Sequence, residues 1–391
     1  MAKIALINQR YGLEVNGGSE YYTRLIAERL AKKHQVEVLT SCALGTTGWP
    51  NHYELGLQDV NGIAVRRFPT TRSHSLGYPT HSEKWVDDVG PFVPDLISYI
   101  REYKDEYDVF IPITYLYYPT VRAAPLVAEK SIVIPTAHNE SFIYYPVYRR
   151  VFGADPAFPK PAFLLFLTEE ERDFIHGLFH NDGIPCDVAG VGVDLPGRVD
   201  SDAFRQKFHI TTDYCLYTGR IEAHGKGCNA LLQYFTQYKK RNSNDLKLVL
   251  MGKSSMKIPK HKDIIHVGFV SEEDKFNGLA GAKALCLHSM FESLSISALE
   301  ALALGVPILV NEHCAVLKGH CEKSDAGLYY KGYFEFEGAL NYLLTHDREY
   351  GIMSENAKRY IQQYYRWDII MEKFEKAIGF ILRQNQGSMA T

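Results

Sequence analysis

The amino-acid sequence predicts an α/β protein of two domains, each a parallel sheet with helices on both faces. Short apolar runs alternate with amphipathic stretches along most of the 391 residues, as in strand–helix–strand units. Residues 190–202, GVGVDLPGRVDSD, break this alternation and are dense in Gly, Pro and Asp, which is typical of a linker. We therefore expect two nucleotide-binding-type domains, residues 1–194 and 195–366, with a ligand site in the cleft between them.

The first domain is expected to begin with a buried strand at KIALIN, residues 3–8, followed by an amphipathic helix that Ser19 is placed to cap. The buried face of that helix is expected to hold Tyr22, Leu25, Ile26 and Leu30. Further strands are expected at VEVLT (36–40), YDVFIPI (107–113), SIVIPTA (131–137) and AFLLFLT (162–168). The last three are continuous apolar runs, which are typical of central parallel strands.

The second domain repeats the alternation after the linker. Strands are expected at YCLYTG (214–219), LKLVLMG (246–252), IIHVGFV (264–270), KALCLHS (283–289) and VPILVNE (306–312). Helices are expected over residues 231–238, from Ser271, where Asp274 completes a capping box, and over Ser295–Leu304. A last helix, residues 367–383, has one apolar face, and the tail 384–391 has no pattern and is expected to be disordered.

Composition excludes several classes of protein. The formal net charge is −3, so nothing indicates a nucleic-acid partner. The N-terminus MAKIALINQR is too short in apolar residues for a signal peptide, and no segment has about 18 uncharged apolar residues, so we expect a cytoplasmic protein. Seven scattered Cys favour reduced thiols. The adjacent pairs His313-Cys314 and His320-Cys321 lack the spacing of a zinc knuckle, so no metal site is expected.

The strongest motif is a pair of glutamates. Glu292 comes just after an expected strand and before a helix, and Glu300 lies inside that helix. The helix N-terminus offers unpaired N–H groups and a positive dipole end, which suit a diphosphate. Glu300, about 12 Å further along the axis, can accept hydrogen bonds from two ribose hydroxyls, and Glu292 from sugar hydroxyls. The alternative is that Glu292 is a first-turn dipole partner and Glu300 a solvated helix charge.

Three weaker motifs follow other strands. TGRIEAHGKG places Arg220 and Lys226 in a glycine turn, where two cations suit a pyrophosphate; the alternative is an ordinary charged loop. NGGSEYY, residues 16–22, lets backbone approach a ligand at Gly17-Gly18, although the third Gly of a dinucleotide fingerprint is missing. His138 directly follows a strand and can hydrogen-bond a sugar, or serve as a structural donor.

Three other patterns carry no function. MGKS at 251–254 lacks the leading Gly of a phosphate-binding P-loop. Asp200-Ser201-Asp202 resembles a metal-binding DxD but lies in the linker, and no GxSxG occurs to support a serine hydrolase.

Together these segments resemble the family 4 retaining glycosyltransferases of the GT-B fold, over nearly the whole chain. Six motifs stand in the family's order: Gly17-Gly18; His138; Gly192–Asp194; Gly219-Arg220 with Lys226-Gly227; Val267–Ser271; and Glu292 with Glu300–Pro307. The resemblance implies two Rossmann-like domains facing across a cleft, with the C-terminal helix, residues 367–391, returning to the first domain. One departure is Ser293-Leu294-Ser295 where the family has G-F-G, which narrows the pocket for the donor sugar.

The resemblance also implies roles for individual residues. Arg220 and Lys226 would bind the donor diphosphate and stabilise it as it leaves, Glu300 would bind the ribose, and Glu292 and His138 would lie against the donor sugar. The remaining donor contacts would come from backbone: phosphate or sugar at Leu294, Ser295 and Ile296, base at Gly252, Lys253, Phe269 and Val270, and phosphate or acceptor at Gly17 and Gly18. The implied catalytic set is His138, Glu292, Arg220 and Lys226.

The implied reaction is a metal-independent hexose transfer, with retention, from UDP-glucose or a close UDP-sugar to a glycan or lipid-linked glycan. No second carboxylate is evident beside Glu292, which favours attack by the acceptor on the face that the diphosphate leaves. The alternatives are a sugar-nucleotide epimerase or inverting transferase of the same fold, and an inactive nucleotide-sugar-binding protein. Residues 142–166 are rich in aromatics and cations and are expected to form a wall of the acceptor groove, or alternatively a peripheral membrane contact.

Overall fold

A computed structural model describes residues 1–15, 17–71 and 80–389 of the chain. The chain divides into two compact units, one of Met1–Gly190 with Ile370–Thr391 and one of Val191–Ile369. The sequence placed these divisions after residues 194 and 366. In the described residues, no helix combines the length and apolar character needed to cross a bilayer.

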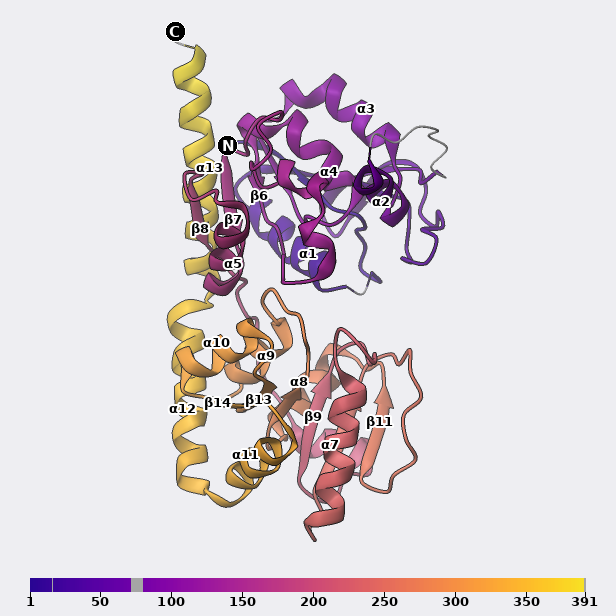
Figure 1. Cartoon of the computed structure of the whole chain (residues 1–391), viewed down its shortest axis with the longest axis vertical. Helices are drawn as coiled ribbons and strands as arrows, with labels where there is room; N and C mark the ends of the chain where they lie inside the picture. Colours follow the sequence, from indigo (N-terminus) through magenta and orange to yellow (C-terminus); the bar gives the residue numbers. More distant parts are fainter. Residues whose placement is uncertain (16, 72–79, 390–391) are drawn as a thin grey trace. The chain divides into compact units, whose positions relative to one another are not determined.

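The first unit, drawn from indigo to magenta in Figure 1, is built on two short sheets that isolated bridges join. The larger sheet has the order β3 (Gly56–Val60), β4 (Ile63–Phe68), β2 (Gln35–Ser41), β1 (Lys3–Ile7), β5 (Val109–Pro112). The smaller sheet has the order β6 (Ile132–Val133), β7 (Phe163–Phe166), β8 (Cys186–Val188). Isolated parallel bridges, Phe110 to Ser131 and Ile113 to Ile134, connect β5 to the smaller sheet. All five strands expected in this half are therefore confirmed.

The edge strand β3 is the exception to the parallel pattern, because it pairs antiparallel with β4. The two strands are joined by Asn61 and Gly62, which have positive φ values of 55° and 78°. This is the backbone that a two-residue hairpin turn requires, and Asn-Gly is its preferred sequence. The expectation of purely parallel sheets was wrong at this edge, and the Asn-Gly pair was the signal for it.

The helices of the first unit follow its strands. They are α1 (Gly18–Leu30), α2 (His81–Val89), α3 (Pro94–Tyr103), α4 (Tyr118–Ala123), α5 (Glu169–Phe179) and the C-terminal α13 (Trp367–Met389). The expectation that Ser19 caps α1 was wrong, because Gly17 is the N-cap and has no side chain to offer. The Ser19 hydroxyl instead accepts from the Gln9 amide at 3.0 Å and donates to Glu20.

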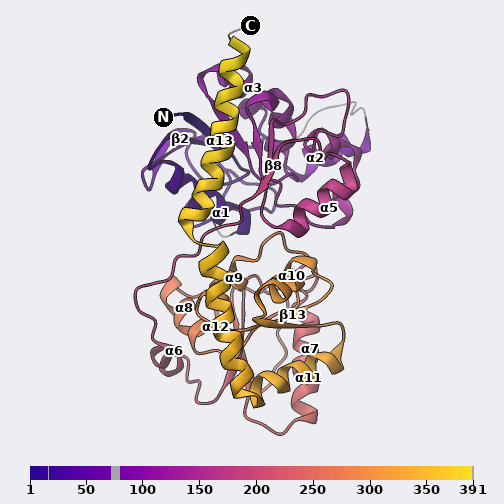
Figure 2. The same ribbon diagram turned by 90° about the vertical axis from the view of Figure 1, so that its left-hand side faces the viewer.

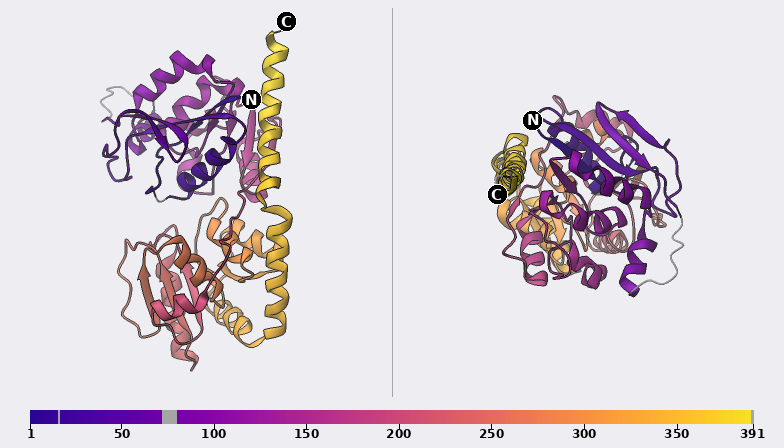
Figure 3. Two further views of the ribbon diagram at one scale, coloured as in Figure 1. Left: turned by 180° about the vertical axis from the view of Figure 1, so that it is seen from behind. Right: turned by 90° about the horizontal axis from the view of Figure 1, so that it is seen from above.

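Helix α13 begins at the end of the second unit, and its residues from Ile370 onward belong to the first (Figures 2 and 3). Its buried face is the one that the sequence predicted, with Ile370, Phe374, Ile378 and Ile381 all fully covered. Phe380 packs edge-on against Phe163 of β7, and Glu375 lies 3.1 Å from the His34 ring. The helix continues to Met389, so the expectation of a disordered tail was wrong over residues 384–389; residues 390 and 391 lie outside the described residues.

The second unit holds one six-stranded parallel sheet. Its order is β11 (Ile264–Gly268), β10 (Lys247–Met251), β9 (Tyr214–Thr218), β12 (Leu285–Leu287), β13 (Ile308–Asn311), β14 (Gly327–Tyr330). Its helices are α6 (Ser201–Lys207), α7 (Cys228–Arg241), α8 (Glu272–Ala280), α9 (Ile296–Ala303), α10 (Ala315–Ser324), α11 (Tyr333–Thr345) and α12 (Asp347–Tyr364). The predicted helix start is confirmed, since the Ser271 hydroxyl accepts from the Asp274 N–H at 3.1 Å. The Asp274 carboxylate accepts from the Ser271 hydroxyl at 2.9 Å.

The strand order of the second sheet reverses at its centre. From β9 the chain moves outward through β10 to β11, and it then returns to the other side of β9 with β12, β13 and β14. The loops after β9 and β12 therefore leave the carboxyl edge of the sheet in opposite directions. In open parallel sheets this switch point is where ligands bind.

Replacing Phe374 by Ala tests the docking of α13. The side chain is fully buried, so its loss should lower the free energy of unfolding of the first unit by about 3–5 kcal/mol. The matched control is Lys376→Ala, whose side chain is 66% exposed and whose effect should stay within about 0.5 kcal/mol. Urea unfolding followed by fluorescence measures both; equal midpoints for the two variants would contradict the docking.

Candidate functional site

Two loops meet at the switch point of the second unit, one after β9 and one after β12. The backbone N–H of Met290 donates to the carbonyl of Gly225 at 2.9 Å. The Lys226 ammonium lies 2.7 Å from Oε1 of Glu292, and both side chains are mostly covered. The structure thus brings together two of the predicted site residues, which are 66 positions apart in the sequence.

Lys226 and Arg220 differ in how much of their charge is available to a ligand. An ammonium has three donors, and one of those of Lys226 goes to Glu292. Arg220 is 70% exposed, and its guanidinium lies 3.5 Å from Glu222 in a surface ion pair of little strength. The Tyr217 hydroxyl donates to the Arg220 carbonyl at 2.6 Å and fixes the backbone of the turn. The loop therefore presents two cations on a constrained backbone.

Two glycines allow the loops to approach each other this closely. A Cβ at Gly227 would lie 2.2 Å from the His288 carbonyl oxygen, at the end of β12. A Cβ at Gly252, after β10, would lie 1.8 Å from the Gly219 carbonyl oxygen, and Gly252 has a φ of +136°. Neither position has room for a side chain, so the edge of the sheet depends on glycine at both.

Serine hydroxyls and backbone N–H groups lie before and at the start of α9. Ser295 is the N-cap of α9 and has a left-handed φ of 65°. The hydroxyls of Ser289 and Ser295 are buried, and in the described part of the chain neither has a hydrogen-bond partner. The first N–H groups of α9, from Ile296, have no partner within the helix. These N–H groups at the start of α9 can bind an anion.

Glu300 lies one turn inside α9 and is only 5% exposed. Its Oε1 is 2.7 Å from the ammonium of Lys275 on α8. Burial raises the pKa of Glu300 above its usual value, although Lys275 acts in the opposite direction. The alternative interpretation, that Glu300 is a solvated helix charge, is therefore wrong. The sequence did not reveal Lys275 as its partner, because the contact depends on how α8 packs against α9.

The residues predicted to hold a base follow β10 and β11, which are neighbours. The Gly252 N–H donates to the Gly268 carbonyl at 2.7 Å, so the ends of these strands lie side by side. The Phe269 ring is 63% exposed, and the Lys253 ammonium lies 5.6 Å from its centre. Gly252, Lys253 and Phe269, with Val270 next in the chain, thus lie together at the end of β10 and β11.

His320 holds the backbone of the loop between Glu292 and α9. The sequence did not reveal this role. Nε2 of His320 lies 2.8 Å from the Leu294 carbonyl oxygen and its Nδ1 lies 3.0 Å from the Tyr360 hydroxyl. Burial lowers the pKa of His320 to about 4, so the ring is neutral at pH 7 and donates from Nε2 to Leu294. No group of His, Cys, Asp and Glu in the described ranges is arranged to hold a metal ion.

In the first unit, the Gly17-Gly18 turn is packed against a buried ion pair. Nε of Arg10 lies 2.9 Å from Glu20, and a Cβ at Gly17 would lie 2.1 Å from the same carboxylate. Gly18 begins α1 and has open space around it. Asn16, the first residue of the predicted motif, lies outside the described residues.

His138 lies in the loop after β6, also in the first unit. Its Nδ1 is 3.4 Å from Glu140, which accepts a hydrogen bond from the Tyr115 hydroxyl at 2.7 Å. The nearby segment 142–166 contributes much of its aromatic content to the core, including Tyr148 and Phe152. Arg150 is engaged by Glu83, whereas Tyr144 stays 54% exposed.

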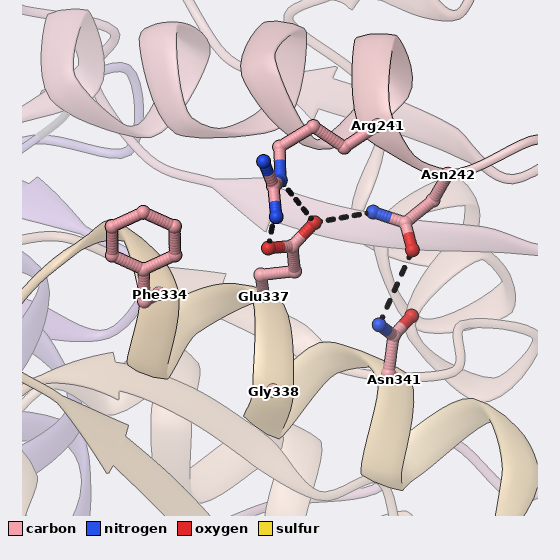
Figure 4. A pocket seen from close by; sticks show the side chains of 6 residues that line it. All are labelled: Arg241, Asn242, Phe334, Glu337, Gly338 and Asn341. Carbon is pink, nitrogen blue, oxygen red and sulfur yellow. Dashed lines mark hydrogen bonds and ion pairs between the residues drawn. The ribbon is translucent and has the colours of Figure 1, made fainter.

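A separate hollow lies in the second unit, where the end of α7 meets α11 (Figure 4). Its lining consists of Arg241, Asn242, Phe334, Glu337, Gly338 and Asn341. Nε of Arg241 donates to Glu337 at 3.0 Å, and Asn242 donates to the same carboxylate. None of the predicted site residues lines it, and its polar groups bind one another.

Replacing Gly252 by Ala should destabilise the second unit by about 2–3 kcal/mol, because a Cβ would meet the Gly219 carbonyl oxygen at an unfavourable φ. Gly351→Ala is the control: Gly351 lies in α12 with no atom near a Cβ, so this change should stabilise by about 0.5–1 kcal/mol. Calorimetric melting compares them, and an unchanged melting temperature for the Gly252 variant would refute the close approach.

The low pKa of His320 predicts a pH dependence of stability. Its folded pKa of about 4 lies below the unfolded value of 6.5. The stability is therefore full above pH 6.5 and falls as the pH drops toward 4, by up to about 3 kcal/mol. His320→Gln should flatten this slope, while the exposed His209→Asn should leave it unchanged. Denaturant unfolding between pH 4 and 7 gives the slopes; equal slopes in wild type and the His320 variant would contradict the prediction.

Part of the chain is similar in sequence to known glycosyltransferases. Residues 200–360 match the family model described as Glycosyl transferases group 1. The MMP alpha-(1->4)-mannosyltransferase of Mycolicibacterium hassiacum is 25% identical over 207 residues, which are 47% of this chain and 48% of that protein. The match thus spans about half the length of this relative.

Solved structures match along nearly the whole chain. Sucrose-phosphate synthase from Thermosynechococcus elongatus has a TM-score of 0.73 at 14% identity, with both chains fully covered. Anabaena Alr3699/HepE, solved in complex with UDP and glucose, has a TM-score of 0.69 at 15% identity and equal coverage. WaaG, a glycosyltransferase of lipopolysaccharide biosynthesis, has a TM-score of 0.67 at 14% identity, covering 97% of this chain and 99% of WaaG. The chain therefore has the GT-B fold, and residues 200–360, within its second unit, are similar to the group 1 glycosyl transferases.

Proposed function

We propose that this protein is a retaining glycosyltransferase that moves a hexose from a nucleotide sugar to a glycan or lipid-linked glycan. The observation that carries the proposal is the Lys226–Glu292 pair at the switch point, with exposed Arg220 beside it. These residues place two cations and one carboxylate where a donor's diphosphate and sugar would meet. The group 1 match covers this whole set, since all three residues lie within residues 200–360.

In this proposal each group acts on a different part of the donor. Arg220 and the free donors of Lys226 bind the diphosphate and stabilise the charge that develops on it. Glu300, held by Lys275, accepts hydrogen bonds from the ribose. Glu292, oriented by Lys226, accepts from hydroxyls of the sugar, and His138 of the first unit contacts the same sugar.

The proposed chemical step needs no metal and no second carboxylate. The bond between the anomeric carbon and the diphosphate oxygen breaks, and an acceptor oxygen forms a new bond to that carbon on the same face. The acceptor proton passes to an oxygen of the departing phosphate. The products are a glycoside with retained configuration and a nucleoside diphosphate. A covalent glycosyl adduct trapped on Glu292 would contradict this route.

The donor proposed is UDP-glucose or a close UDP-sugar. Support comes from Anabaena HepE, which was solved with UDP-glucose, and from an Escherichia coli structure described with UDP-2-fluoro glucose. The matched mannosyltransferase makes a mannose donor the main competitor. Among the UDP-, GDP- and ADP-sugars, measured release of nucleoside diphosphate should be fastest with UDP-glucose. No release with any donor and acceptor would favour an inactive binding protein, and interconversion of the donor would favour an epimerase.

Substitutions at Glu300 and Glu292 should affect UDP binding and turnover separately. Glu300→Gln should weaken UDP binding about tenfold or more, because a charge-assisted hydrogen bond to the ribose is lost. Glu292→Gln should leave UDP affinity within about threefold and lower kcat by on the order of a hundredfold, because its contact is to the sugar. Calorimetric titration with UDP and turnover assays measure the two effects. The reverse assignment, with Glu292 controlling UDP affinity, would contradict the division of roles.

A further inference from the structure

A buried carboxylate joins two loops in the first unit. Glu171 lies in the first turn of α5 and is 2% exposed. Its Oε1 accepts from the backbone N–H of Ala137 at 2.5 Å, and its Oε2 accepts from the N–H of Leu167 at 2.6 Å. Each oxygen therefore holds one strand end, since Ala137 follows β6 and Leu167 follows β7. Within the described residues, no cation pairs with this group.

The loop that contains Ala137 has strained backbone just before that residue. Thr136 has a φ of 49° and Thr114, which faces it, has a φ of 71°. Their hydroxyls are 3.1 Å apart and hydrogen-bonded. β-Branched residues rarely adopt this left-handed region, and they remain there only when the surroundings fix them. The Ala137–Glu171 bond follows Thr136 directly, so it is one of the contacts that fix the loop.

Helix α1 also borders the carboxylate. The Tyr22 ring is buried on the inner face of α1, and its hydroxyl has no hydrogen-bond partner among the residues that the structure describes. Burial, and after it the charge of Glu171, raise the pKa of the Tyr22 phenol. Glu171 therefore contacts the His138 loop through Ala137 and lies near Tyr22 of α1, the helix that begins at Gly18.

Ionising a carboxyl group that is this deeply buried costs free energy. Burial raises the pKa of Glu171 to about 8, although the two N–H groups act to lower it. A Gln or an apolar residue would avoid that desolvation. Glutamate offers in return two acceptor oxygens on one rigid plane, which reach two backbone donors at once. What the group provides is therefore the relative position of two loops.

We propose that Glu171 is a positioning residue, which fixes Ala137 and thereby presents the His138 imidazole to the donor sugar. This inference rests on the proposed function, because the role of His138 belongs to it. Glu171 itself is buried and touches no substrate. Its effect on turnover must then pass through His138.

A double-mutant cycle tests this directly. Glu171→Gln keeps the size of the side chain but places an N–H₂ against one of the two backbone donors. It should lower kcat with UDP-glucose by on the order of tenfold to a hundredfold, with KM changed less, as misplacement of a reacting group does. In a His138→Ala background the same change should have almost no further effect. Glu169→Gln, on the exposed side of the same turn, is the matched control and should match wild type.

A measurement without turnover separates this inference from the proposed function. The imidazole resonance of His138 in NMR spectra, assigned by its loss in His138→Ala, should shift in Glu171→Gln and stay unshifted in Glu169→Gln. Exchange of the Ala137 and Leu167 amide protons in the wild-type protein should be slow, which also tests the clamp if the variant does not fold. If the resonance shifts in Glu171→Gln but the wild-type protein turns over no donor, the positioning role stands and the proposed function is rejected. Additive effects in the cycle, an unshifted resonance or fast amide exchange would overturn the positioning role.

Discussion

The ion pair between Lys226 and Glu292 is the contact on which the site depends. It connects the loop after β9 to the loop after β12 at the one place where the sheet's strand order reverses. Without it, Glu292 would be a largely buried carboxylate with no counter-ion, and breaking such a pair is costly. The carboxyl edge of the sheet is packed so tightly that positions 227 and 252 have no room for a side chain, and both are glycine.

Other buried polar groups support residues of the predicted site in each unit. Lys275 holds Glu300, and His320 holds the Leu294 carbonyl. In the first unit, Glu171 holds Ala137 in the same manner. Each is a buried polar group with its partner in place. Lys275 and His320 fix residues predicted to contact the donor, and Glu171 fixes the residue before His138. A site held this way is preorganised, which is what stabilisation of a developing charge requires.

Much of the architecture could be predicted from the sequence, because strands and helices follow from residue patterns over short stretches of the chain. Apolar runs located the parallel strands, and Ser271 with Asp274 located a helix start. The errors were also local: Ser19 was taken as a cap where Gly17 serves, and the Asn61-Gly62 hairpin was overlooked. The partners Lys275, His320 and Glu171 could not be predicted, because each contact joins residues that strand order brings together. His320 lies 26 positions from Leu294, and Glu171 lies 34 from Ala137. Pattern and spacing carry no information about such pairs.

The most direct test of the central claim is a crystal structure of the protein with an intact or fluorinated UDP-sugar bound. We expect diphosphate oxygens within hydrogen-bonding distance of Arg220 and Lys226, the ribose diol on Glu300, and a sugar hydroxyl on Glu292. This expectation would be contradicted by a diphosphate bound away from the loops after β9 and β12, with neither Arg220 nor Lys226 in contact with it.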